Sequence, residues 1–184
     1  GNDKQATPCQ FRTSQTTTLW PIELSGVKYF SSNSSLAAAG WHGPEKCKAG
    51  IRFQLSTQPG IDFSQLPIDE LVMNIAGEDD LPMKLYEQIF ANGLGFIIKD
   101  KSEPESQGQF FSAEHIAQSG FEDEEALLPF PNRSFQGYRL LQEYFTFPKR
   151  FLFFKLTALQ NFLAGFSGSD IEITVLLDNS HSEL

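Results

Sequence analysis

Cysteine, histidine and methionine are scarce in this sequence, and their scarcity removes several classes of protein from consideration. Only two cysteines, three histidines and two methionines occur among the 184 residues. Two cysteines cannot build a disulfide framework, which favours a reduced, cytoplasmic chain. The cysteines and histidines also match no common zinc-binding spacing. We therefore expect neither a metal ion nor another cofactor.

Basic residues and long apolar runs are also in short supply. The 14 lysines and arginines face 23 acidic residues, which gives a net charge of −9. A surface this acidic repels phosphate backbones, so nucleic acid is a poor candidate partner. No apolar run approaches the roughly 20 residues that a transmembrane helix needs, and the first residues form no hydrophobic leader. Direct membrane insertion is therefore not expected.

Motifs of catalysis are missing as well. The sequence has no Gly-x-Ser-x-Gly elbow, phosphate-binding loop, dinucleotide fingerprint or His-Glu-x-x-His pair. The four acids at residues 122–125 could be read as carboxylates for acid–base chemistry. Adjacent acids more often form the solvated start of a helix, where the positive end of the dipole favours them. We predict that the chain is not an enzyme.

Phenylalanine is abundant, and its pattern together with that of the aliphatic residues predicts the fold. The 18 phenylalanines outnumber the four tyrosines and two tryptophans together, so most aromatic side chains are suited to a core or an interface. Residues 51–57 alternate strictly between apolar and polar side chains, as a half-buried strand does. The sequence predicts a β-rich α+β fold, with sandwich-like antiparallel β units and short packed helices.

Turn and cap residues set the expected boundaries of the elements. A helix should begin at Asp79 or Asp80, carry Pro82 in its first turn and stop at Asn92-Gly93. Residues 31–50, rich in small residues, are expected to form a loop. Further strands are predicted at residues 16–24, 71–75, 94–99, 151–158 and 171–178, and further helices at residues 122–128 and 137–145.

One domain should contain most of the chain. We expect a flexible segment at residues 1–15, a β-rich domain at residues 16–178 and a tail at residues 179–184. The strands that begin at Ile51 and Leu71 have the same twenty-residue spacing as those that begin at Phe151 and Ile171. This repeated spacing predicts two similar halves, at about residues 16–100 and 110–178.

The most informative stretch is residues 120–154, called the signature segment below. It reads GFEDEEALLPFPNRSFQGYRLLQEYFTFPKRFLFF. A proline-rich stretch at residues 129–131 precedes a predicted helix with aromatic residues on two faces. Pro148 ends this helix, and an aromatic strand follows. Arg139 is predicted to tie the helix to residues 129–134 and, four residues away, to pair with Glu143. In the strand we assign Leu152 and Phe154 to the core, and Phe151 and Phe153 to an interface.

The signature segment resembles the TssF family, also called ImpG or VasA, of the type VI secretion baseplate. Looser likeness covers most of the chain, which is much shorter than whole TssF proteins. Lys149 and Lys155 depart from the pattern, because the family often carries acids there. The resemblance implies a cytoplasmic structural protein at the baseplate that docks on the inner-membrane complex. Its implied partners are a TssG-like subunit, a second TssF copy, a TssK-like subunit and the VgrG spike hub.

If the chain works by assembly, aromatic anchors in desolvated pockets should carry the recognition. The residues we single out as structural or interface candidates are Trp20, Trp41, Arg133, Tyr138, Arg139, Glu143, Tyr144, Phe147, Pro148, Phe151 and Phe153. An alternative is a stand-alone β-sandwich that binds carbohydrate or another ligand through an exposed Trp20 and Trp41.

Overall fold

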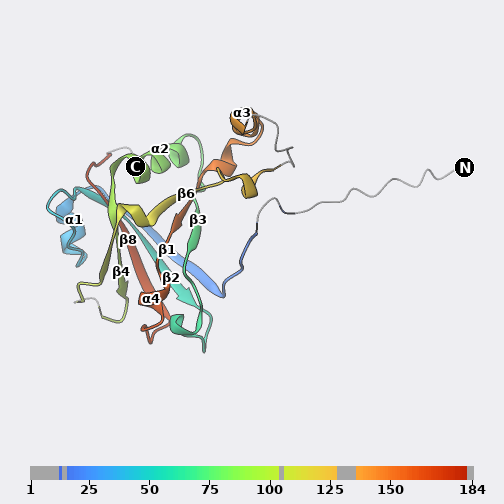
Figure 1. Cartoon of the computed structure of the whole chain (residues 1–184). Coiled ribbons are helices and arrows are strands. Elements are labelled where there is room, and N and C mark those ends of the chain that lie inside the picture. Colours follow the sequence, from blue (N-terminus) through green and yellow to red (C-terminus); the bar gives the residue numbers. More distant parts are fainter. Residues whose placement is uncertain (1–12, 14–15, 104–105, 128–135, 182–184) are drawn as a thin grey trace, which may run out of the picture.

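A computed structural model describes residues 13, 16–103, 106–127 and 136–181. Within these residues, two antiparallel sheets are packed face to face, with short helices around them (Figure 1). The five-stranded sheet has the order β1 (Ile22–Phe30), β2 (Ala49–Thr57), β8 (Asp170–Leu177), β4 (Gly93–Asp100), β5 (Gln109–Ser112). The three-stranded sheet has the order β3 (Leu71–Asn74), β7 (Phe153–Leu156), β6 (Ile116–Ser119). The predicted β-rich α+β class is confirmed.

The helices in the described residues are short. They are α1 (Asn33–Ala38), α2 (Leu81–Asn92), α3 (Gln136–Thr146) and α4 (Gln160–Leu163). Single 3₁₀ turns occupy Phe63–Gln65, Ala113–His115, Asp123–Glu125 and Pro148–Phe151. The acidic run thus forms a 3₁₀ turn where we predicted a short α-helix. In Figure 1, α2 lies along one end of the sandwich and α3 stands apart from the sheets.

The main core lies between the two sheets. Alternate side chains of β2, from Ala49 to Leu55, are buried in it, as the sequence pattern predicted. Phe154 of β7 meets Phe53 of β2 across the core, with 6.2 Å between ring centroids. β8 is buried on both faces, because Leu176 belongs to a second cluster on the far side of the large sheet. This accounts for the unbroken apolar run Val175–Leu177 at its end.

The second cluster explains why residues 31–50 are not simply the predicted loop. They contain helix α1, whose N-cap Ser32 accepts a hydrogen bond from the Ser35 amide at 3.2 Å. α1 places Leu36 on the outer face of the large sheet, beside Phe30 and Trp41. The apolar burial and the serine cap stabilise a helix that the small residues of this stretch do not by themselves signal.

Helix α2 follows its sequence signals closely. It starts at Leu81 after Asp80, has Pro82 in its first turn and ends at Asn92. β4 begins with the next residue. The strand predicted at residues 16–24 instead begins at Ile22, just after Pro21. A proline lacks the amide that a sheet ladder needs, so the ladder with β2 starts only after it.

The aromatic strand is shorter than predicted. Residues 148–151 form a 3₁₀ turn, and β7 begins at Phe153. Within this turn the buried Arg150 guanidinium donates a hydrogen bond to the backbone carbonyl of Gly120, 3.0 Å away. Leu152, Phe154 and Leu156 are buried in the main core, as expected, while Phe153 on the other side of the strand is half-buried.

Both predicted halves contribute to each sheet. β2 pairs with β8 in the large sheet, and β3 pairs with β7 in the small one. The two stretches, residues 16–100 and 110–178, therefore share one core. Their origin as a duplication stays a prediction.

Candidate interaction surface

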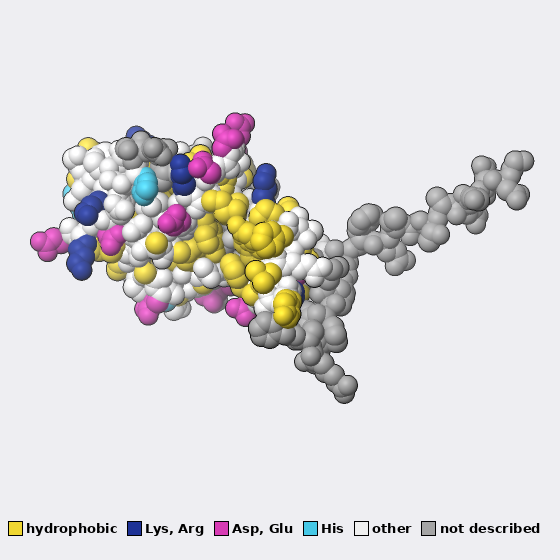
Figure 2. All heavy atoms as spheres, turned by 90° about the horizontal axis from the view of Figure 1, so that it is seen from above, with side chains coloured by type: hydrophobic (Ala, Val, Ile, Leu, Met, Phe, Trp, Pro, Cys, Tyr) yellow, Lys and Arg dark blue, Asp and Glu magenta, His cyan; other side chains and the backbone are white. Residues whose placement is uncertain are grey.

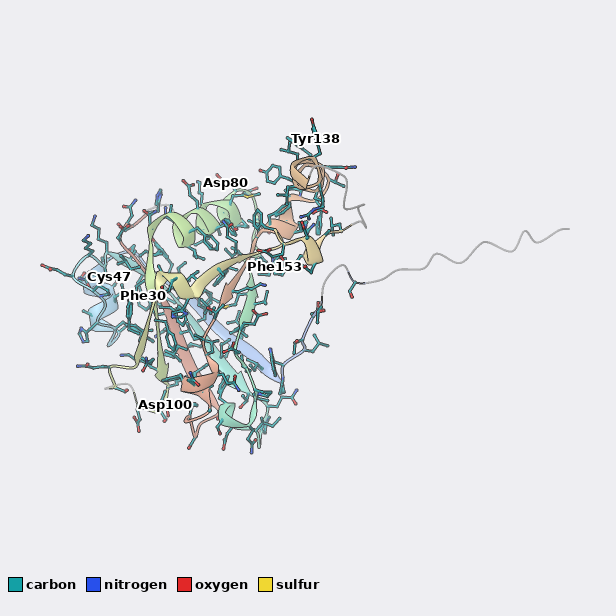
Figure 3. The ribbon with its side chains drawn as sticks, in the orientation of Figure 1. Phe30, Cys47, Asp80, Asp100, Tyr138 and Phe153 are labelled. Atoms are coloured by element: carbon teal, nitrogen blue, oxygen red, sulfur yellow. The ribbon has the colours of Figure 1, made fainter. Side chains whose placement is uncertain are left out.

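Helix α3 presents apolar side chains to solvent. The predicted helix is confirmed, and Tyr138, Leu141 and Phe145 share one face at helical spacing. The exposed fractions are 73% for Tyr138, 57% for Leu141, 46% for Tyr144, 81% for Phe145 and 50% for Phe147. Figure 3 shows Tyr138 at the outer side of α3, away from the sheets, and Figure 2 shows hydrophobic side chains gathered on the face that carries α2 and α3. We call these five residues the α3 surface.

The opposite side of α3 is charged and faces the body of the protein. Glu143 is buried there, and its Oε1 accepts a hydrogen bond from the Leu127 amide at 3.0 Å. Arg139 lies 3.4 Å from Glu143 Oε2, so the predicted pair four residues apart is present. The usual arrangement of an amphipathic helix, apolar side inward, is therefore reversed.

Arg150 holds the centre of this charged layer. Its guanidinium is buried and forms a salt bridge with Glu143. It also donates hydrogen bonds to the backbone carbonyls of Gly120, at 3.0 Å, and Glu125. A planar guanidinium with several donors is suited to this combination of one carboxylate and two carbonyls. Arg150 thus joins the turn after α3 to the loop after β6.

Arg139 reaches the same loop from the helix itself. It donates hydrogen bonds to the Phe121 carbonyl and to Asp123 Oδ1, both at 3.2 Å. Its role in tying down α3 is therefore visible, although through residues 121–123. Residues 129–134, where we placed the contact, lie outside the described residues.

Glu125 stabilises the loop after β6 by binding back to its first residues. Its carboxylate accepts hydrogen bonds from the Gly120 amide at 2.6 Å, the Ser119 hydroxyl at 3.0 Å and the Glu122 amide at 3.2 Å. Lys155 of β7 lies 3.6 Å away. Burial raises the pKa of Glu125, but these hydrogen bonds and the lysine charge outweigh it and hold the pKa below its ordinary value of 4.5.

This lowered pKa predicts how stability depends on pH. A carboxyl group whose pKa is lower in the folded state contributes stability above its unfolded value, and the contribution is lost as pH falls through the folded value. Replacing Glu125 by Gln should therefore lower the melting temperature at about pH 7, and the difference from wild type should shrink below about pH 4. Thermal melts across this pH range measure it. The exposed Glu124→Gln serves as the control, and a wild-type difference that is independent of pH would contradict the assignment.

Gly120 makes the loop possible through its backbone. Its φ is +99°, in the region that favours glycine, and an added Cβ would lie 3.0 Å from the Arg150 carbonyl oxygen. The same glycine donates to Glu125 and accepts from Arg150. The first residue of the signature segment is therefore a structural requirement of the loop under α3.

Two of the predicted anchors are inside the protein. Trp41 is only 1% exposed and lies under the Lys99 amine, 4.5 Å from its ring centroid. Phe151 is buried against Phe121 and Tyr144, with 4.9 and 6.1 Å between ring centroids. Neither can act as an exposed anchor in this conformation. Phe151 instead supports the base of α3.

Trp20 and Phe153 meet at a different place. Both line a groove of about 400 Å³ on the outer side of the small sheet, together with Val72, Glu125 and Lys155. Phe153 is half-buried there, so it remains an interface candidate. Trp20 and Trp41 do not share a surface, because Trp41 lies in the cluster beyond the large sheet. This separation is incompatible with the sugar-binding pair of tryptophans that we considered.

The remaining candidates lie close to α3. Tyr144 and Phe147 belong to the α3 surface, and Pro148 opens the 3₁₀ turn that contains Arg150. Arg133 falls outside the described residues. The sequence reasoning did not single out Arg150 or Glu125. One signal could have identified Arg150: it is directly followed by the apolar residues 151–154. An arginine next to such a buried stretch is itself drawn into the interior, where its charge needs partners.

Among the described residues, no group of three or more His, Cys, Asp and Glu side chains is arranged to hold a metal ion. In the same part of the chain, no helix is both long and apolar enough to cross a bilayer.

Comparison with known proteins agrees with the signature segment. The family model described as "Type VI secretion system, TssF" matches residues 1–184. The chain belongs to the TssF family. It is 35% identical over 184 residues to the type VI secretion system component TssF1 of Pseudomonas aeruginosa. That match covers 100% of this chain and 29% of TssF1, so the chain spans less than a third of this curated relative.

A solved structure has the same fold. The cryo-electron microscopy structure of the type VI secretion system TssK-TssF-TssG baseplate subcomplex contains a chain that matches this one with a TM-score of 0.71. The match covers 90% of this chain and 29% of the other, at 21% identity. The two-sheet architecture described here therefore occurs within a baseplate assembly.

Proposed function

We propose that this TssF-family chain is part of a structural subunit of the type VI secretion baseplate and acts by assembly rather than catalysis. Its role is to join a wedge complex with a TssG-like subunit, on which the contractile tail is built for effector delivery. Such a subunit works in the cytoplasm, at the baseplate docked on the inner-membrane complex.

The reversed orientation of α3 carries this proposal. The charged residues Arg139 and Glu143 face inward to Arg150, and the apolar side of the helix is left in solvent. Exposed apolar patches rimmed by polar residues are typical of protein–protein contact sites. A helix held from behind by a buried ionic network presents these side chains on a rigid support, which lowers the entropy cost of binding.

The proposed partners follow from the related complex. TssK and TssG accompany TssF in the solved baseplate subcomplex, so a TssG-like and a TssK-like subunit are the first partners we propose. A second TssF copy and the VgrG spike hub are further proposed partners. The solved subcomplex supports the TssG-like and TssK-like partners more directly, because it contains both. The second TssF copy and the spike hub do not appear in its name.

Substitution of the α3 surface in living cells tests the proposal. We expect Leu141→Ser combined with Phe145→Ser, introduced into the native gene, to abolish assembly of the contractile tail while the subunit stays abundant. Both side chains are mainly exposed, so their loss should spare folding. Fluorescently labelled sheath gives the readout.

Val27→Ser provides the matched control, because Val27 is an exposed apolar residue on edge strand β1, away from α3. Cells with this variant should assemble tails normally. Normal tail assembly in the α3 double variant would contradict the proposal.

A further inference from the structure

Strand β5 leaves one edge of the large sheet open. Within the described residues it is bonded to β4 on one side, with Phe110 opposite Ile97 and Phe111 opposite Phe96, and no strand is bonded to its other side. Every second residue of an edge strand directs its amide and its carbonyl away from the sheet. Two of the four residues of β5 therefore present backbone donors and acceptors to which another extended chain can bond.

The two edges of this sheet are built differently. At the opposite edge, β1 carries Glu23 and Lys28, and its register with β2 shifts between Leu24 and Gly26. Charges and bulges of this kind discourage an edge from pairing with another chain. β5 reads Gln-Phe-Phe-Ser, with no charge, no proline and no shift in its register with β4. Of these protections, β5 has only its short length.

A hollow lies beside β5 on each face of the sheet. On the core side, Phe111 and Phe162, which meet edge to face with 6.4 Å between ring centroids, help to line a space of about 780 Å³. On the outer face, Ile97 and Pro44 help to line a space of about 300 Å³. Phe110, which is 44% exposed, borders both. A strand added beside β5 would direct its side chains in turn to the two faces, and so to the two hollows.

The lining of both hollows is uncharged. It contains no aspartate, glutamate, lysine or arginine, although the chain has a net charge of −9. The polar groups at the core-side hollow are the amides of Gln109 and Asn161, the Ser112 hydroxyl and the His115 ring. A charged side chain would lose water there without gaining an oppositely charged partner. The lining therefore favours an uncharged and mainly apolar occupant.

From the open edge, the hollows on its two sides and their uncharged lining, we infer that β5 binds an extended, uncharged segment of a partner protein as an additional strand of the large sheet. Main-chain hydrogen bonds hold the segment, and its alternate side chains fill the two hollows. At about 3.4 Å per residue, β5 is about 14 Å long, so a segment of about four to six residues is sufficient.

This surface is separate from the α3 surface. The first residue of β5, Gln109, lies opposite Ile98, close to the end of β4 at Asp100. In Figure 3, Asp100 and Tyr138 of α3 lie on opposite sides of the molecule. The inference thus goes beyond the proposed function, because it gives the chain a second place of attachment that recognises backbone as well as side chains.

Calorimetric titration of the purified chain with a synthetic peptide tests the inference. The probe is acetyl-Ser-Val-Thr-Phe-Thr-Val-Ser-amide, which is uncharged and alternates apolar with small polar side chains. We expect saturable binding with a dissociation constant below about 1 mM, because main-chain bonds and side-chain pockets both contribute. Replacing both threonines of the peptide by glutamate should weaken binding at least about tenfold.

Two methylated forms of the peptide test the main-chain bonds directly. One form carries an N-methyl group on its phenylalanine and the other on the threonine before it. Neighbouring residues of a strand direct their amides to opposite edges, so only one of these methyl groups replaces a hydrogen that faces β5. We expect one form to bind at least about tenfold more weakly and the other to bind like the parent peptide. Equal binding by the two forms, or binding by neither, would overturn the addition of a strand.

Substitutions in the chain locate the site. Phe110→Ser should weaken binding at least about tenfold, because this side chain borders both hollows. Val72→Ser is the matched control, since Val72 is also 44% exposed and lies on β3, an edge strand of the small sheet. Leu141→Ser with Phe145→Ser should bind normally, so this inference and the proposed function stand or fail separately. A chain that does not bind the peptide, or that binds it equally after Phe110→Ser, would overturn the inference.

Cross-linking in living cells identifies the source of the segment. A photoreactive phenylalanine analogue in place of Phe110, encoded in the native gene, should cross-link on irradiation to a different protein, within a segment free of charged residues. A synthetic peptide of that segment should bind the purified chain and lose affinity with Phe110→Ser. A cross-link to another part of the same polypeptide would mean that the edge is completed internally. That result, or the lack of any cross-link, would overturn the assignment to a partner protein.

Discussion

Phe154→Ala is expected to lower the free energy of unfolding by about 3–5 kcal/mol, the usual cost of removing a phenylalanine from a core. Phe154 is 1% exposed and lies opposite Phe53 of β2, so it joins the two sheets at their centre. The sheets cannot collapse easily onto the space, because both are fixed by their own ladders. For a domain of ordinary stability, a loss of this size leaves much of the protein unfolded or aggregated.

Urea denaturation of the purified variant measures this effect, with Phe153→Ala as the matched control. Phe153 is the next residue on the same strand but is only half-buried, on the outer side of the small sheet. Its loss should cost clearly less than that of Phe154. Equal costs for the two variants would mean that the small sheet is covered on both sides, contrary to the burial described here.

Arg150→Ala should be comparably harmful, at about 3–5 kcal/mol, for an electrostatic reason. The substitution removes the salt-bridge partner of buried Glu143 and leaves the carbonyls of Gly120 and Glu125 without their donor. Buried polar groups that lose their partners bear the full cost of having left water. We expect a fall in melting temperature of about 6–20 °C, at about 2–4 °C per kcal/mol for a chain of this size.

Two comparison variants distinguish the effect of the unpaired buried charge from the effect of lost packing. Arg139→Ala should cost less, about 1–3 kcal/mol, because Arg139 bonds partly to the exposed carboxylate of Asp123. Replacing both members of the buried pair, Arg150→Met with Glu143→Leu, should recover part of the stability, since the buried carboxylate is removed together with its guanidinium and Arg139 keeps Asp123 as its partner. If the double variant were as unstable as Arg150→Ala, lost packing rather than the orphaned charge would be the cause.

The signature segment combines these two kinds of residue in one stretch of chain. Its charged residues, with Gly120, build the support under α3, and Phe154 at its end joins the support to the core. Its aromatic residues on α3 face solvent. Lys155 is part of the support through Glu125, while Lys149 is exposed just after the helix. An acid in place of Lys155 would set two carboxylates against each other.

Local patterns in the sequence determined much of the fold. The alternation from Ile51 to Thr57 set the strand and its buried face, because side chains in a strand alternate between two sides. Pro82 and Asn92-Gly93 set the limits of α2, since they control which backbone amides and dihedral angles a helix can use. The segment at residues 120–154 identified the family. These signals are local, and no distant contact overrides them.

Only the tertiary structure decided which way α3 faces. Helical spacing gathers Tyr138, Leu141 and Phe145 on one side, but it does not say whether that side meets the protein or a partner. The direction is fixed by Arg150, which binds Glu143 of the helix and also the carbonyls of Gly120 and Glu125, 30 and 25 residues away in sequence. Trp41 is buried for the same kind of reason, because helix α1 and the outer face of the large sheet enclose it. The spacing of apolar residues along the sequence shows which of them share a face of a helix or strand. Whether that face is buried depends on which other parts of the chain pack against it.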